Sequence, residues 1–373
     1  MQLQQPQRFL ALDVFRGITV CFMIIVNTPG GPAYSPLQHA AWHGFTPTDL
    51  VFPSFLFAVG NAMSFVMLKW QSKPQREILW RIFKRTAIIF LLGFLMYWFP
   101  FFKFDQHWNM IALPISETRI FGVLQRIALC YGIAALIVYY LKPKVALLVC
   151  VILLLLYWFI MVTFGNAADP LSMMGNAGQK LDLWLLGKKH LYGGEGVPFD
   201  PEGLLSTMPA IVNVVAGFVV GQYIQQKGKT YEGLSKLLLA GFGLFVIAYF
   251  WNLVFPINKK LWTSSYVLHT VGLDCMILSG IMYVIDFKQK AKWANFFQPF
   301  GKNPLVIYIF SELFIVVLFM IPVGRNNVPG WAYQKIFRNA GDLFGSLLFA
   351  LTYMMICWSL AYWMDRKKIY VKV

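Results

Sequence analysis

The chain has 373 residues, of which 58% are hydrophobic and only 13% are charged. A soluble domain carries about a quarter charged residues, so this composition excludes a disordered chain, a fibre and an ordinary soluble enzyme. It predicts a helical membrane protein with several spans. The formal net charge of +16 would suggest nucleic-acid binding in a soluble chain. Here the basic residues lie mostly in short loops between apolar segments, so we attribute the charge to membrane topology and expect no nucleic-acid partner.

Ten apolar segments reach the length of about 20 residues that a helix needs to cross the hydrocarbon core. They cover residues 10–28, 49–69, 78–99, 119–141, 145–164, 203–225, 234–254, 264–285, 303–322 and 342–364. We therefore expect an all-α polytopic membrane protein, in which a single transmembrane domain covers residues 1–373 and about ten helices form a bundle.

An even number of spans places both termini on the same side of the membrane. If that side is the cytoplasm, the inner loops and termini carry twice as many Lys and Arg residues as the outer loops, which favours an N-in/C-in orientation. The long outer loops are then residues 29–48, 100–118, 165–202 and 323–341, and they hold four of the five histidines. Long polar loops on one side suit a site for a polar ligand from outside.

The first outer loop contains His39 and His43 within the sequence HAAWHGFTPTDL. Histidines four residues apart on a helix can bind a metal, but no HExxH glutamate lies between them and no third ligand is nearby, so we expect no metal. Asp49 follows at the start of the second span. Its carboxylate either caps that helix or orients a histidine, and the sequence leaves both alternatives open.

Polar side chains follow one face of the first span. Asp13, Arg16 and Asn27 fall within about 60° of one another at 100° per residue. Ionisable groups inside a span are costly unless they face the bundle interior, so they are candidates for a functional site. Asp13 and Arg16 can form a structural ion pair, whereas Asn27 lies at the outer end beside the histidine loop.

Two arginines mark the fourth span. Arg119 and Arg126 are seven residues apart, so we expect them on one helix face with Gln125 nearby. A buried arginine needs a carboxylate, a phosphate or carbonyl groups. The partner is either a carboxylate in another span or a phosphate of a nucleotide cofactor, and the sequence does not decide between them.

Two outer loops end in polar residues close to a span. The third outer loop contains His190, Asp200 and Glu202. These residues either lie in a solvated loop that leads into the next helix or line a site. The short loop PINKKLWTSSY contains Asn258 and Trp262. A tryptophan there suits an edge contact with a sugar or an anchor at the membrane interface.

The ninth span also carries polar groups in an apolar setting. It begins at Asn303, directly after Lys302 on the expected inner surface, and it contains Glu312. Glu312 is another candidate for a carboxylate inside the membrane.

Seven motifs of this chain, taken together and in order, resemble the heparan-α-glucosaminide N-acetyltransferase family, and in particular its bacterial NagX-type members. They are RFLALDVFRG, HAAWHGFTPTDLVFP, GVLQR, LLGKKHLY, DPEG, PINKKLW and GKNPLVIY. The resemblance covers nearly the whole chain. Its specificity comes from the ordered combination, because no single motif is decisive.

This resemblance implies a transmembrane acetyltransferase that moves acetyl from cytosolic acetyl-CoA to the amine of a terminal glucosamine at the outer face. It also implies a homodimer in a lipid bilayer, which we expect to be the inner (cytoplasmic) membrane of a bacterium. The active histidine of the family matches His39, while His43 falls where the lysosomal enzyme has asparagine. His39 then acts either as a general base or as a nucleophile that carries the acetyl group.

Further roles follow from this scheme. We expect Asp49 to orient His39 and Asn27 to donate a hydrogen bond to the developing oxyanion. The residues expected to bind acetyl-CoA are Arg16, Arg126, Gln125, Lys302 and Asn303. The residues expected to contact the acceptor are Trp42, His190, Asp200, Glu202, Asn258 and Trp262.

Two other functions remain as alternatives. A transporter for a sugar or an organic anion would account for charged residues within the spans, although no internal repeat is evident. An O-acyltransferase of envelope glycan would use the same histidine but a hydroxyl acceptor.

Overall fold

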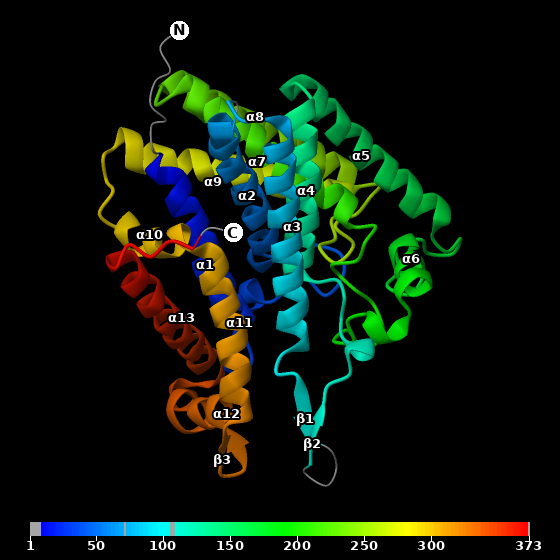
Figure 1. Ribbon diagram of the computed structural model, residues 1–373, viewed down its shortest axis with the longest axis vertical. Helices are drawn as coiled ribbons and strands as arrows, with labels where there is room; N and C mark the ends of the chain where they lie inside the picture. The colour runs from blue at the N-terminus through cyan, green and yellow to red at the C-terminus, as the bar shows by residue number, and fades with distance from the viewer. Residues whose placement is uncertain (1–8, 71, 105–108, 372–373) are drawn as a thin grey trace.

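The computed structural model describes residues 9–70, 72–104 and 109–371. All ten predicted apolar segments form helices close to the expected bounds (Figure 1). They are α1 (Leu10–Asn27), α2 (Val51–Trp70), α3 (Gln75–Trp98), α4 (Val123–Tyr140), α5 (Pro143–Phe164), α7 (Thr207–Lys227), α8 (Tyr231–Asn252), α9 (Ser264–Met282), α11 (Pro304–Met320) and α13 (Asp342–Arg366). The predicted all-α polytopic fold is therefore confirmed.

Eight of these helices, within the described residues, are by themselves long and apolar enough to cross a membrane. α11 meets that condition together with the short helix α10 (Ala294–Lys302), and the two are bent by 84° at Asn303. α3 has 24 residues, but its first half carries Arg81, Lys84 and Arg85, which make it less apolar.

The outer loops contain short elements that the apolar pattern did not predict. The loop after α3 forms an antiparallel hairpin of β1 (Phe102–Phe104) and β2 (Met110–Ala112). The loop after α5 contains α6 (Ala177–Leu186) and the loop after α11 contains β3 (Pro322–Val323), β4 (Asn326–Asn327) and α12 (Val328–Ala332). These segments are too short to be detected by hydrophobic periodicity.

Close helix packing depends on glycine at two matched positions. A Cβ atom on Gly60 of α2 would lie 1.9 Å from the carbonyl oxygen of Val214, and one on Gly217 of α7 would lie 2.0 Å from that of Phe57. The backbones of α2 and α7 therefore touch, as small residues allow between membrane helices. This contact holds the middle of α2 against α7, and the candidate site lies at the outer end of α2.

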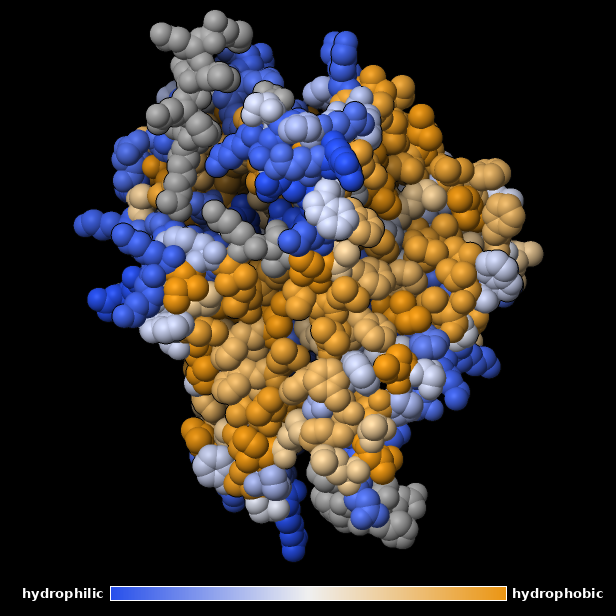
Figure 2. Space-filling model, viewed as in Figure 1, coloured by the Kyte–Doolittle hydropathy of each residue, from blue (hydrophilic) through white to orange (hydrophobic). Residues whose placement is uncertain are grey.

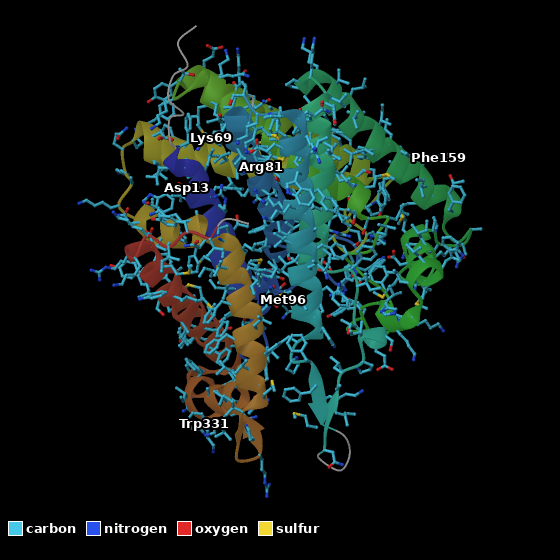
Figure 3. All side chains as sticks on the ribbon, viewed as in Figure 1. Asp13, Lys69, Arg81, Met96, Phe159 and Trp331 are labelled. Atoms are coloured by element: carbon cyan, nitrogen blue, oxygen red, sulfur yellow. The ribbon has the colours of Figure 1, made fainter. Side chains whose placement is uncertain are left out.

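The surface divides into polar ends and an apolar middle. Figure 2 shows a broad orange band running from the upper right to the lower left, with blue side chains gathered above it on the left and below it on the right. Figure 3 places Lys69 and Arg81 toward the top and Trp331 of α12 at the bottom, so the α2–α3 loop and α12 lie at opposite ends. This arrangement agrees with the expected topology.

Two spans are poorly covered by the rest of the chain. Only 28% of the most apolar stretch of α5 and 22% of that of α8 is buried inside the protein. Phe159 of α5 points away from the bundle at its right edge (Figure 3). These helices face the lipid or a second copy of the chain. The predicted homodimer stays a prediction.

Candidate active site

His39 and Asp49 form a hydrogen-bonded pair at the outer end of α2. His39 Nδ1 lies 2.7 Å from Asp49 Oδ1. Because an ionised carboxylate only accepts hydrogen bonds, the shared hydrogen of a neutral imidazole sits on Nδ1 and Nε2 keeps its lone pair. The side chain of His39 is 41% exposed, whereas that of Asp49 is fully buried. The pair is therefore a histidine held from behind by a carboxylate and open in front.

The carboxylate of Asp49 is fixed by its own turn. Its Oδ2 accepts from the backbone N–H of Thr46 (2.9 Å), the hydroxyl of Thr46 (3.1 Å) and the backbone N–H of Ala40 (3.2 Å). Thr46 and Asp49 form a capping box around the 3₁₀ turn Pro47–Leu50, which leads into α2. The two alternatives for Asp49 are thus both true, since one oxygen atom caps the turn and the other orients His39.

The loop 255–263 between α8 and α9 holds the histidine loop in place. Lys260 Nζ donates to the carbonyl oxygen of Ala41 (3.1 Å) and to Glu195 Oε2 (2.6 Å). The backbone N–H of Gly44 donates to the carbonyl oxygen of Ile257 (2.8 Å). Three outer loops that are distant in sequence therefore meet at His39.

Lys259 of the same loop reaches the open side of His39. Its Nζ lies 3.0 Å from His39 Nε2, the nitrogen that Asp49 does not bind. Burial lowers the pKa of Lys259 below its usual value, although the charges of Glu202 and Asp49 act in the opposite direction. A primary amine with reduced basicity thus faces the lone pair of the histidine.

Two of the residues expected to contact the acceptor, Trp42 and Asn258, lie in or against the histidine loop. Trp42 Nε1 donates to the carbonyl oxygen of Leu171 (3.0 Å). Asn258 Nδ2 lies 3.4 Å from Nδ1 of His43, and burial lowers the pKa of His43. His190 Nδ1 instead bonds the carbonyl oxygen of Thr118 (2.8 Å) and connects two outer loops.

Trp262 does not offer its ring to a ligand. It is fully buried, its Nε1 donates to Asn213 Oδ1 (3.1 Å), and the guanidinium carbon of Arg126 lies 4.8 Å from its ring centroid. In this conformation it makes neither a sugar-edge contact nor an interfacial anchor, because the loop carrying it folds back into the bundle. It supports the site from beneath.

Arg119 lies outside the helix in which we expected it. α4 begins only at Val123, after an extended Gly122, so Arg119 and Arg126 do not share a helix face. Arg119 instead binds Asp200 through two nitrogens (2.9 and 2.6 Å) and Glu202 through one of them (2.6 Å). Burial alone would lower the pKa of Arg119, but these two carboxylates raise it. Asp200 and Glu202 are thus held in an ion-pair cluster.

Asn27 is linked to the carboxylate that the ninth span contributes. Its Nδ2 donates to Glu312 Oε1 at 3.2 Å. The contact joins the outer end of α1 to α11. An asparagine amide has two hydrogens, so this bond fixes the side chain and uses one of them.

A second group of predicted residues lies deeper in the bundle. Arg16 forms the expected ion pair with Asp13 (3.9 Å) and donates to the carbonyl oxygen of Gly301 (3.0 Å). A cavity between α1, α2, α3, α4 and α11 is lined by Arg16, Arg85, Ala62, Ile127, Tyr131 and Leu305, among others. Two arginines therefore border a space that is otherwise mainly apolar.

Several buried polar atoms on α3 and α4 have no hydrogen-bond partner among the described residues. They are Nε and Nη1 of Arg126, both side-chain atoms of Gln125, Nε of Arg85 and the hydroxyl of Tyr131. Buried polar groups in folded proteins are generally paired with protein, water or ligand. These atoms are therefore suited to a polar ligand that enters the bundle.

Lys302 and Asn303 are occupied by the C-terminal segment. Lys302 Nζ bonds both carboxylate oxygens of Asp365 (2.8 Å each). Asn303 bonds the backbone of Ile369 and Val371. In this structure their polar groups hold the end of the chain against α10, so neither is free to meet a ligand without displacing it.

Within residues 9–70, 72–104 and 109–371, no group of three or more His, Cys, Asp or Glu side chains is arranged to hold a metal ion. His39 and His43 are separated by their different partners, Asp49 and Asn258. The expectation that no metal is involved stays a prediction.

Comparison with known proteins identifies the family of this chain. A family model described as heparan-alpha-glucosaminide N-acetyltransferase, catalytic, matches residues 8–236, which is more than half of the chain. The chain belongs to this family. The human heparan-alpha-glucosaminide N-acetyltransferase is 26% identical over 422 residues, covering 99% of this chain and 60% of the human protein. The mouse protein is 26% identical over 363 residues, covering 82% of this chain and 53% of its own length.

This chain thus spans little more than half the length of these heparan-alpha-glucosaminide N-acetyltransferases. The stretch matched by the family model contains His39, Asp49, Arg119 and Arg126. Lys259 lies beyond it. Lys259 belongs to the PINKKLW motif, but the sequence alone did not predict it as a site residue. Its position between the polar Asn258 and Lys260 was the one available signal.

Proposed function

We propose that this protein is a membrane-embedded acetyltransferase, which moves acetyl from acetyl-CoA to the amine of glucosamine or of a terminal glucosamine residue at the outer face. The observation that carries the proposal is the His39–Asp49 pair: Asp49 bonds Nδ1, and Nε2 lies 3.0 Å from a primary amine. An amino sugar is mostly an ammonium ion at neutral pH and must lose a proton before it attacks a thioester. A histidine in this setting takes that proton.

In the proposed reaction the amine attacks the thioester carbonyl carbon as His39 Nε2 accepts the proton. Asp49 keeps Nδ1 protonated and stabilises the imidazolium ion that forms. The second amide hydrogen of Asn27 is assigned to the oxyanion of the tetrahedral intermediate, while Glu312 holds the side chain through the first. The thiolate of CoA then leaves and is reprotonated.

The donor path is assigned to the cavity bordered by Arg16 and Arg85. Ala62 on its wall lies 13 residues beyond Asp49 along α2, which is about 20 Å inward at 1.5 Å per residue. A long thin pantetheine arm suits such a slot, and guanidinium groups suit its phosphates. Arg126 and Gln125 lie between this cavity and the outer loops, and their unpaired atoms fit the polar amides of the arm.

We assign the acceptor to the outer side, where the three loops meet. Trp42 and Asn258 hold the loops there through their hydrogen bonds, while His190 connects the third outer loop to Thr118 and the Arg119 cluster fixes the end of the 165–202 loop. Lys302 and Asn303 would contribute to donor binding only if the C-terminal segment moved. The bilayer, a homodimer and a bacterial inner membrane complete the proposal.

The test is transfer by the purified protein in detergent, with radiolabelled acetyl-CoA and either glucosamine or N-acetylglucosamine. Only glucosamine offers a free amine, so label should reach it alone. His39→Ala should abolish transfer and Asp49→Asn should strongly reduce it. Asp169 is an exposed carboxylate in an outer loop, and Asp169→Asn should leave transfer unchanged. Label on N-acetylglucosamine would favour the O-acyltransferase, and no transfer to any amino sugar would leave the transporter as the better reading.

The same assay separates the two roles of His39. A general base leaves no label on His39 before the acceptor arrives. An acyl-imidazole would be released by hydroxylamine and would disappear in His39→Ala.

A further inference from the structure

Lys259 occupies the position that the reaction requires of its acceptor. A general base must lie within hydrogen-bonding distance of the proton it removes, about 2.6 to 3.2 Å between heavy atoms. Lys259 Nζ lies 3.0 Å from His39 Nε2, and like the amine of glucosamine it is a primary amine on a carbon chain or ring. The protein therefore holds one of its own amines against the base.

The surroundings of Lys259 set it apart from the adjacent lysine. Lys260 Nζ is bound to the carboxylate of Glu195 at 2.6 Å and to a carbonyl oxygen, so its hydrogens are directed away from His39. In the described part of the chain no carboxylate lies within ion-pair distance of Lys259 Nζ, and burial lowers the pKa of that amine. Of the two neighbours, Lys259 is the one that can lose its proton to His39.

We propose that Lys259 is an internal acetyl acceptor, which His39 activates and acetyl-CoA modifies when no amino sugar is bound. This inference rests on the proposed function, because the donor is the same. The ε-nitrogen attacks the thioester carbonyl carbon, a C–N bond forms and the C–S bond breaks with its electron pair going to sulfur. His39 takes the proton from nitrogen and CoA leaves as the thiol, so the products are Nε-acetyllysine and CoA without any redox step.

The modification also blocks the acceptor position. An acetylated Lys259 carries no charge and adds an acetyl group beside His39 Nε2. The loop cannot easily withdraw it, since Lys260 is bound to Ala41 and Glu195, and Asn258 accepts from the backbone of Leu261 at 2.9 Å. Chains modified in this way lose transfer to glucosamine.

The experiment uses the full chain in detergent with deuterium-labelled acetyl-CoA, and mass spectrometry of the digested protein. Without acceptor, we expect acetyl at Lys259 to approach one per chain and to exceed that at Lys260 by at least about tenfold. Excess glucosamine should suppress it by a similar factor in the wild type, which needs no variant. His39→Ala should remove it although the lysine remains.

Transfer to glucosamine is measured in the same samples as acetylation of Lys259. A failure of this inference can therefore be told apart from a failure of the proposed function. Transfer with no excess of acetyl at Lys259 over Lys260 overturns this inference alone. Absence of both overturns the proposed function and the inference with it. Equal acetylation in wild type and a folded His39→Ala protein would show uncatalysed chemistry and also reject the inference. Hydroxylamine-resistant label distinguishes acetyllysine from an acyl-histidine.

Discussion

Arg126 and Trp262 lie against each other in the interior, with the guanidinium carbon 4.8 Å from the ring centroid. Both side chains are fully buried. The contact joins α4 to the loop that carries Lys259, and Asn213 of α7 holds the ring from its other end through Nε1. A cation over a desolvated tryptophan face contributes about 2 kcal/mol. The loop that faces His39 is therefore anchored by a buried contact beneath the site.

Removing this ring should weaken both stability and activity. Replacing a buried tryptophan with alanine costs about 3 to 5 kcal/mol, so Trp262→Ala should lower the melting temperature and reduce acetyl transfer as the loop loosens. Trp262→Phe should fall between it and the wild type. Trp184→Ala is the control, because that ring is 82% exposed. A melting temperature unchanged in Trp262→Ala would contradict the anchoring role.

Asp49→Asn should reduce turnover by at least about 100-fold. An amide nitrogen facing His39 Nδ1 would donate to it, so the ring hydrogen would move to Nε2, which then cannot accept a proton. The Michaelis constant for glucosamine should change little, because Asp49 is buried behind the histidine. Steady-state kinetics measure both constants. Turnover within a few-fold of the wild type would exclude the orienting role.

Removing Arg119 alone from its ion-pair cluster with Asp200 and Glu202 should lower the stability of the protein. Arg119→Ala leaves Asp200 and Glu202 buried without their partner, and such a loss costs about 3 to 5 kcal/mol. Adding Glu202→Gln to that variant should recover part of the loss, since it removes one of the uncompensated charges. Thermal unfolding in detergent tests both, with the exposed Arg325→Ala as control. A double variant less stable than Arg119→Ala would argue against this account.

Asp182 of α6 makes stability depend on pH. Burial raises its pKa to about 7, well above the value of about 3.9 in an unfolded chain. As pH rises between these values the unfolded chain loses the proton first, so folding becomes less favourable and the penalty levels off above pH 7. Asp182→Asn keeps an acceptor for the N–H of Leu204 and removes the penalty. Its melting temperature should exceed that of the wild type by more at pH 8 than at pH 5, whereas an equal difference at both values would count against it.

Arg85 should matter for the donor but not for the acceptor. It borders the proposed donor cavity and its Nε has no partner among the described residues. Arg85→Ala should raise the Michaelis constant for acetyl-CoA by about tenfold, equivalent to about 1.4 kcal/mol, and leave that for glucosamine unchanged. Arg76→Ala on the exposed start of α3 is the control. Equal effects on both substrates would place the donor elsewhere.

The sequence predicted the helices well because long apolar segments leave the chain few alternatives in a membrane. It also predicted the contact between His39 and Asp49, since the two residues are only ten positions apart in the sequence. The sequence did not predict contacts between residues that are far apart in the chain. Lys259 meets His39 across 220 residues, and nothing in the local pattern of Trp262 shows that its loop folds inward. Arg119 was misplaced because the extended Gly122 delays the start of α4.

We propose that the His39–Asp49 pair transfers acetyl to an amine on the side of the membrane opposite the donor. The most direct test reconstitutes the protein in sealed liposomes with labelled acetyl-CoA trapped inside and glucosamine only outside. We expect labelled N-acetylglucosamine in the outer medium, at a rate that His39→Ala abolishes. Transfer that occurs only when both substrates share one compartment, or that survives His39→Ala, would contradict it.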